Sequence, residues 1–132
     1  MQYGLTAAPA SQPRNALVGQ ALSLVIAQGI GNAKNLDLWL RQSLATSLAI
    51  GVMAKLGVTH PPAGAAALLF SSGIFSWQQV AIMLMANMVA ILCATLVNNL
   101  SEQRQYPTFW GLRFVSELLS VSEEKPSGKK NI

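Results

Sequence analysis

Residues 80–97 read VAIMLMANMVAILCATLV, and this stretch decides the class of fold. It is free of charge, and Asn87 and Thr95 are its only polar side chains. A run of this length and composition can cross the hydrocarbon core of a bilayer, which needs about 17–25 residues. Trp77 precedes the run, at the position where interfacial aromatic residues gather. The stretch therefore predicts a transmembrane helix.

The rest of the chain has the same apolar character. Its 132 residues are 52% hydrophobic and only 11% charged, whereas soluble domains carry about 25% charged residues. Residues 56–101, 15–33 and 42–54 contain no Asp, Glu, Lys or Arg. This hydrophobicity excludes a disordered chain, and the single cysteine, Cys93, excludes a disulfide scaffold. The class that remains is a small all-α integral membrane protein, whose first partner is the lipid bilayer.

The positive charge of the chain does not indicate a nucleic-acid partner. The net charge is +4, but aromatic residues make up only 7% of the chain and do not alternate with the basic ones. Basic ends on an apolar body fit membrane topology better than phosphate binding. Five of the nine basic residues follow the last apolar run, namely Arg104, Arg113, Lys125, Lys129 and Lys130.

Two further runs and one short helix complete the expected bundle. The runs are Ala16 to Ile30 and roughly Leu36 to Val58. After them, Pro61 and Pro62 open a helix from Ala63 to Phe70 that Ser71-Ser72-Gly73 ends, which is too short to cross a membrane. We expect about three spans plus a Pro-started half-helix that enters and leaves the membrane on one side.

The charges assign an orientation to this bundle. We divide the chain into a transmembrane domain, residues 1–110, and a polar C-terminal tail, residues 111–132. With a re-entrant half-helix, the tail and the loop containing Lys34 and Arg41 share one side, which holds seven of the nine basic residues. The positive-inside rule places that side in the cytoplasm or the stroma of a plastid.

Small residues recur four positions apart in each of the three runs. Such stripes let membrane helices approach closely, within one chain or between copies, so a homo-oligomer is compatible with the sequence. The stripes are Gly19, Ser23 and Ala27; Ser43, Ser47 and Gly51; and Ala86, Ala90 and Ala94.

The turn His60-Pro61-Pro62 is the most informative place for chemistry. The prolines preset the first turn of a helix whose start, at Ala63 and Gly64, carries no bulky side chain. Free N–H groups there would favour an anion, and His60 adds a donor and, when protonated, a positive charge. In the alternative interpretation the prolines form a tight corner and His60 bonds to a carbonyl group.

Three more residues extend this anion-site hypothesis. Arg14 and Asn15 stand at another helix start on the same predicted side, and a guanidinium group suits a planar oxyanion. Arg14 could instead meet lipid phosphates. Asn87 lies inside a span, where a polar side chain usually faces the bundle, and its alternative role is an interhelical hydrogen bond.

Enzyme chemistry is not expected. The apolar runs contain no carboxylate, and the chain has one histidine and one cysteine without metal-ligand spacing. It also lacks a glycine-rich phosphate loop. We therefore assign no catalytic residue, cofactor or metal ion.

Residues 59–68, THPPAGAAAL, resemble the signature of the HPP family of integral membrane proteins. The resemblance extends to Gln12-Pro13-Arg14-Asn15 with Gly19 and Gln20, to Asn98-Asn99-Leu100 and to Tyr106-Pro107-x-x-Trp110. It covers about Leu5 to Trp110.

This resemblance implies four membrane helices, the first of which would precede Leu5, so the chain is expected to lack it. Some plant members of the family are implicated in nitrite transport across the chloroplast envelope, and some bacterial members are fused to CBS domains. The resemblance therefore implies transport of a small anion, nitrite, in a plastid envelope or a bacterial inner membrane. A membrane scaffold or assembly partner without transport stays open as the alternative. Transport of a neutral or cationic solute is a third, and the lack of acids in the runs disfavours cations.

Overall fold

A computed structural model describes residues 2–100, 102 and 105–108. Throughout these residues the regular structure is helical, without a strand. A short 3-10 turn, η1 (Pro9–Ser11), precedes α1 (Pro13–Gly31), α2 (Leu38–Lys55), α3 (Pro61–Phe70) and α4 (Trp77–Asn99). The all-α prediction is confirmed for this part of the chain. The predicted tail, residues 111–132, lies outside it.

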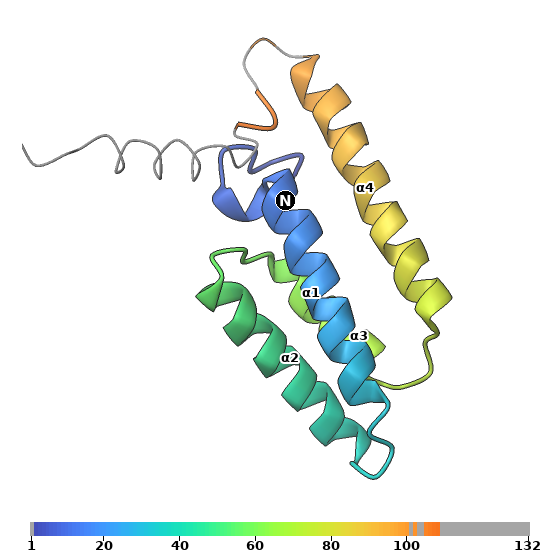
Figure 1. The fold of residues 1–132 in the computed structure, drawn as a ribbon. Helices are drawn as coiled ribbons and strands as arrows, with labels where there is room; N and C mark the ends of the chain where they lie inside the picture. Colours follow the sequence, from blue (N-terminus) through green and yellow to red (C-terminus); the bar gives the residue numbers. More distant parts are fainter. Residues whose placement is uncertain (1, 101, 103–104, 109–132) are drawn as a thin grey trace, which may run out of the picture.

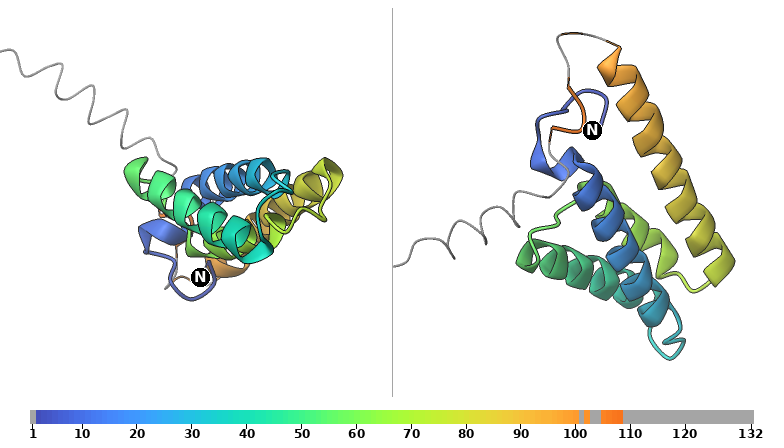
Figure 2. Two further views of the ribbon diagram at one scale, coloured as in Figure 1. Left: turned by 90° about the horizontal axis from the view of Figure 1, so that it is seen from below. Right: turned by 45° about the horizontal axis from the view of Figure 1, so that its top comes forward.

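The four helices are arranged around α1. Helix α1 packs against α2, α3 and α4, and α2 also packs against α3 (Figure 1). Both views of Figure 2 show α2 and α4 on opposite sides of α1. Helix α4 therefore depends on α1 for most of its packing, and most of its surface is open.

Local sequence explains where the helices begin and end. Proline occupies the first turn of α1 and α3, where its missing N–H has no cost. Helix α4 starts with a capping box, in which the Ser76 hydroxyl accepts the N–H of Gln79 and the Gln79 side chain accepts the N–H of Ser76. Helix α2 ends before Gly57, whose positive φ of 65° suits a glycine after a helix.

Small side chains form the centre of the bundle, and they let α1, α2 and α3 approach closely. The closest approach is at Gly19, where a Cβ atom would lie 2.8 Å from the Val58 carbonyl oxygen and 2.9 Å from the Cβ of His60. The buried cluster between the helices comprises Leu24, Ala27, Ala45, Ala49, Ala66, Ala67, Phe70 and Val80.

Only one of the described helices is both long and apolar enough to cross a membrane. Helix α4 has 23 residues, and the most apolar window within it has a mean hydropathy of 2.5 and is 17% buried. Helix α3 is apolar but has only 10 residues. Of the three spans that the sequence predicted, length and composition therefore support one among the described helices, α4.

Helix α3 runs toward one end of the bundle and does not turn back within its length, unlike the half-helix that the sequence predicted. The end of α3 lies beside the end of α1, because a Cβ atom at Gly31 would be 3.2 Å from the Phe70 carbonyl oxygen. Helix α3 can reach that end despite its length because it begins beside Gly19, part of the way along α1. It then covers only the remaining part of α1.

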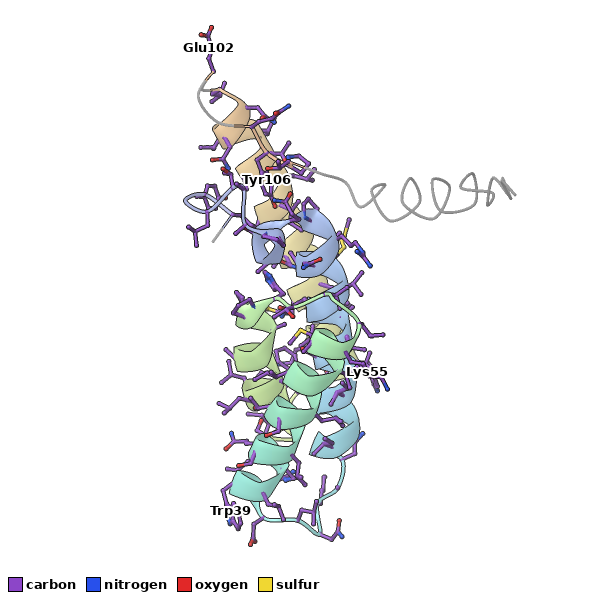
Figure 3. All side chains as sticks on the ribbon, turned by 90° about the vertical axis from the view of Figure 1, so that its left-hand side faces the viewer. Trp39, Lys55, Glu102 and Tyr106 are labelled. Atoms are coloured by element: carbon purple, nitrogen blue, oxygen red, sulfur yellow. The ribbon has the colours of Figure 1, made fainter. Side chains whose placement is uncertain are left out.

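The helix arrangement also differs from the one on which the predicted orientation was based (Figure 3). Helix α4 runs back, and the Tyr106 hydroxyl that follows it donates to the Ser11 carbonyl at 2.7 Å. Figure 3 shows Tyr106 and Glu102 at one end of the bundle and Trp39 at the other. The residues that lead into the tail thus lie at the opposite end from Lys34 and Arg41.

Candidate functional site

A polar cavity of about 170 Å³ lies where α3 begins. Its walls come from the N-terminal segment, the start of α3 and the middle of α4. The lining residues are Gln2, Tyr3, His60, Pro62 and Asn87. The fold therefore brings together three residues that the sequence singled out, namely His60, Pro62 and Asn87.

The imidazole of His60 is fixed by one hydrogen bond. The side chain is 4% exposed, and its Nδ1 lies 2.9 Å from the Ala10 carbonyl oxygen. Because a carbonyl oxygen only accepts, Nδ1 carries the proton, and Nε2 is the nitrogen left to meet a ligand. The bond to a carbonyl group that the alternative interpretation expected is thus present, and it still leaves one ring nitrogen for chemistry.

The surroundings of His60 control its charge. Burial lowers the pKa of His60 below its ordinary value of 6.5, and the hydrogen bond to Ala10 offsets part of this effect. The imidazole is therefore neutral at pH 7. A negative charge beside Nε2 would raise this pKa, because it stabilises the imidazolium form.

Asn87 connects α4 to α1 beside the cavity. Its side-chain amide donates to the Ala16 carbonyl oxygen at 3.0 Å, across 71 residues of sequence. This is the interhelical hydrogen bond that the sequence left open as an alternative role. The same bond holds the middle of α4 against α1, so it also fixes one wall of the cavity.

The start of α3 does not offer the free N–H groups that the sequence predicted. Pro61 and Pro62 have no N–H, and the N–H of Ala63 donates to the His60 carbonyl oxygen at 2.9 Å. Gly64 is buried toward α2, since a Cβ atom there would lie 3.5 Å from the Ile50 side chain. The expectation that Ala63 donates to an anion is therefore wrong.

The other predicted residues lie outside the cavity lining. Arg14 is exposed on the first turn of α1. Asn15 is buried and donates from its side-chain amide to the Thr59 carbonyl oxygen at 3.4 Å, which ties α1 to the turn before His60. Pro61 is exposed. Of the predicted site residues, His60, Pro62 and Asn87 therefore line one cavity, and Arg14, Asn15 and Pro61 lie elsewhere.

Gln2 and Tyr3 are cavity residues that the sequence did not indicate. Gln2 is held by a partner far along the chain, because the Asn98 side-chain amide donates to the Gln2 carbonyl oxygen at 2.9 Å. No local sequence pattern predicts a contact between two residues that are 96 positions apart. The sequence signal that could have placed Gln2 and Tyr3 near the cavity is the pair of motifs around Gln12 and Tyr106. These two motifs carry the family resemblance, and they lie next to each other in the fold.

These motifs form a clasp above the cavity, composed of residues 9–12 and 105–108. Tyr106 is 1% exposed and bonds to Ser11, as described above. The Gln12 side-chain oxygen accepts the N–H of Thr108 at 3.1 Å. Ala10, the partner of His60, lies within the same segment. The clasp therefore positions the imidazole from above.

We also searched the described residues for side chains that could bind a metal ion. Within residues 2–100, 102 and 105–108, no three His, Cys, Asp or Glu side chains lie close enough to hold a metal ion. The cavity offers amide, phenol and imidazole groups instead. Such groups bind small polar or anionic molecules through hydrogen bonds.

Comparison with known proteins places the chain among membrane proteins. The model of the HPP transmembrane region matches residues 1–107. Two proteins of Dictyostelium discoideum, each named only as a transmembrane protein, are similar to it. One is 34% identical over 117 residues, which cover 82% of this chain and 41% of the relative. The other is 32% identical over 116 residues, which cover 82% of this chain and 37% of the relative.

The chain spans about two fifths of the length of these curated relatives. No solved structure matches it.

Proposed function

This chain belongs to the HPP family of transmembrane proteins, and from that premise we propose that it transports a small inorganic anion, nitrite, across a lipid bilayer. The observation that carries the proposal is the polar cavity lined by His60, whose hydrogen bond to Ala10 uses Nδ1 and leaves Nε2 without a backbone partner among the described residues. Nitrite comes from the family resemblance. The chemistry of the cavity suits small oxyanions as a class.

The lining of the cavity favours an anion over a cation. Among the described residues it contains no carboxylate. The Tyr3 hydroxyl donates to the Ala90 carbonyl oxygen and the Asn87 amide donates one N–H to the Ala16 carbonyl oxygen. The donors left for an anion are therefore the second N–H of the Asn87 amide, the Gln2 amide and Nε2 of His60 in its protonated form. The cavity volume of about 170 Å³ exceeds the roughly 30 Å³ that a water molecule takes in liquid water. There is room for a three-atom anion with one or two water molecules.

His60 can neutralise the anion that it binds. An anion at Nε2 raises the pKa of the imidazole, so binding is accompanied by proton uptake. The resulting pair carries no net charge, which lowers the cost of holding an anion away from water. Arg14 contributes only from outside, as an exposed charge at the start of α1.

The test is nitrite uptake into sealed proteoliposomes, with nitrate and chloride as competing anions. We expect saturable uptake by the wild-type chain and a loss of about tenfold or more in His60→Gln, since one charge-assisted hydrogen bond is worth roughly 1.5–3 kcal/mol. Glutamine retains a donor for Ala10 but cannot become charged.

Thr59→Ala is the matched control. The exposed Thr59 side chain precedes His60, and only its backbone oxygen contacts Asn15. Uptake by this variant should equal that of wild type. Equal uptake by His60→Gln and Thr59→Ala, at equal protein level, would contradict the role of His60. Uptake no greater than that of empty liposomes, by folded protein, would contradict transport itself.

A scaffold function without transport is the second candidate, and one observation favours it. The small-residue stripe of α2 is fully on the surface, because Ser43, Ser47 and Gly51 are all exposed. In a membrane such a face accepts another helix, from a second copy or a different protein. This candidate predicts a stable stoichiometric complex and no nitrite flux by the chain alone.

A further inference from the structure

The end of the bundle opposite the cavity holds an arginine without a counter-charge. Arg41 lies in the first turn of α2 and is half-buried. Its Nη1 donates to the Gly31 carbonyl oxygen at 2.9 Å, while its Nε is buried and lacks a hydrogen-bond partner among the described residues. In the same part of the chain no carboxylate forms an ion pair with it, and Asp37, the acid nearest in sequence, is exposed.

The guanidinium group is held in place by three segments. Gly73, in the loop between α3 and α4, has a φ of 80°, and a Cβ atom there would lie 2.5 Å from the Gly31 carbonyl oxygen and 2.8 Å from Nη1 of Arg41. The loop can approach only because residue 73 is glycine. The end of α1, the start of α2 and this loop therefore enclose Arg41, so the side chain cannot extend freely toward water.

The same loop supplies a second donor that has no partner. The hydroxyl of Ser72, next to Gly73, is buried and forms no hydrogen bond with the described residues. The Ser72 hydroxyl and Nε of Arg41 are both buried without a partner among the described residues, and each such group costs free energy. Both costs disappear when an oxyanion accepts hydrogen bonds from the two groups.

The depth of this site in the membrane follows from the tryptophans. Figure 3 shows Trp39 at the end of the bundle remote from Tyr106, and Trp39 is 65% exposed. Trp77 begins α4 only a few residues after the Gly73 loop and is also exposed. Exposed tryptophans gather at the level of the lipid headgroups. Arg41 therefore lies at the depth where phosphate groups are found.

We propose that Arg41 and Ser72 form an oxyanion site that binds a phosphate group, from a lipid headgroup or from free inorganic phosphate. The guanidinium nitrogens that Gly31 does not use donate to two phosphate oxygens, as the planar fork of arginine allows. The partial positive charge at the start of α2 adds to the attraction. The site is independent of the cavity, so the proposal does not rest on transport.

The experiment is native mass spectrometry of the full chain in a maltoside detergent, which contains no phosphate. Phosphatidic acid is titrated against wild type, Arg41→Gln and Lys34→Gln. Lys34 is the matched control, because it is an exposed cation in the loop before α2. We expect one bound phosphatidic acid in wild type and in Lys34→Gln, and binding about tenfold weaker or more in Arg41→Gln.

The source of the phosphate is decided by competition. Displacement of the lipid by millimolar inorganic phosphate would support a site for the free ion as well, and its absence would support a site for the headgroup. Equal lipid binding by Arg41→Gln and Lys34→Gln would overturn the proposal. If Arg41→Gln fails to fold, Ser72→Ala decides, because it leaves the bond to Gly31 intact: weaker binding supports the site, and unchanged binding overturns it.

Discussion

At the scale of single residues, Gly19 controls how closely α1 approaches the turn before α3. Replacing Gly19 with alanine would place a Cβ atom 2.8 Å from the Val58 carbonyl oxygen and 3.1 Å from the Met53 sulfur. The backbone must shift to relieve this contact, so we expect a loss of about 1–3 kcal/mol in the free energy of unfolding. Denaturant unfolding in detergent micelles measures this loss.

Gly29, on the same helix, is the control for that experiment. A Cβ atom at Gly29 meets nothing within 4 Å. Because alanine is the better helix former, Gly29→Ala should raise the free energy of unfolding by about 0.5–1 kcal/mol. Similar losses in both variants would contradict the close packing at Gly19.

His60 makes the stability of the protein depend on pH. Because burial lowers the pKa of His60 below 6.5, the unfolded chain binds more protons than the folded chain as the pH falls through this value. The contribution of neutral His60 is complete above pH 6.5 and is lost as the pH falls toward the lowered pKa. Melting temperatures at pH 8 and pH 5 should therefore differ more for wild type than for His60→Gln. Parallel shifts in the two proteins would refute this role of His60.

At the scale of the element, the exposed position of Cys93 on α4 predicts how this thiol reacts with labelling reagents. Helix α4 is about 35 Å long by its residue count, and Cys93 is exposed on its surface, several residues before the end at Asn99. If that surface faces lipid, a water-soluble reagent cannot reach the thiol. A membrane-impermeant maleimide should then label Cys93 in detergent and not in intact membranes. Equal labelling rates in both would show that this face of α4 meets water.

Individual helices were predictable from sequence because their signals are local. The charge-free run at residues 80–97 identified α4, and the capping box at Ser76 extends the helix to Trp77–Asn99. The two prolines and the Ser71-Ser72-Gly73 break gave both ends of α3. Such signals act within one or two turns of helix.

The direction of α3 and the full cavity were not predictable in this way. The length of an apolar run does not reveal at what level along its neighbour the helix begins, and for α3 that level is set by the contact with Gly19. Gln2 and Tyr3 enter the cavity through bonds to distant residues such as Asn98. The N–H of Ala63 is not free for an anion because it donates to the His60 carbonyl oxygen within the same turn, and the sequence did not reveal this bond.

At the scale of the whole molecule, the fold predicts opposite membrane sides for its two ends. Single cysteines at Lys34 and Gln105, introduced into a Cys93→Ser background, report on these ends because both residues are exposed. In sealed vesicles of one orientation, an impermeant thiol reagent should label one position and not the other. Labelling of both from the same side would contradict this prediction and support the orientation that the charges suggested.

The clasp between residues 9–12 and 105–108 has a consequence for biosynthesis. Ser11 and Gln12 are synthesised before their partners, because Tyr106 and Thr108 follow 95 and 96 residues later. At translation rates of about 5–20 residues per second, that delay is roughly 5–20 s. During this interval α1, α2 and α3 can associate while the N-terminal segment waits for its partners. Completion of the clasp therefore has to wait for the synthesis of residue 108, after the helices that line the cavity have been made.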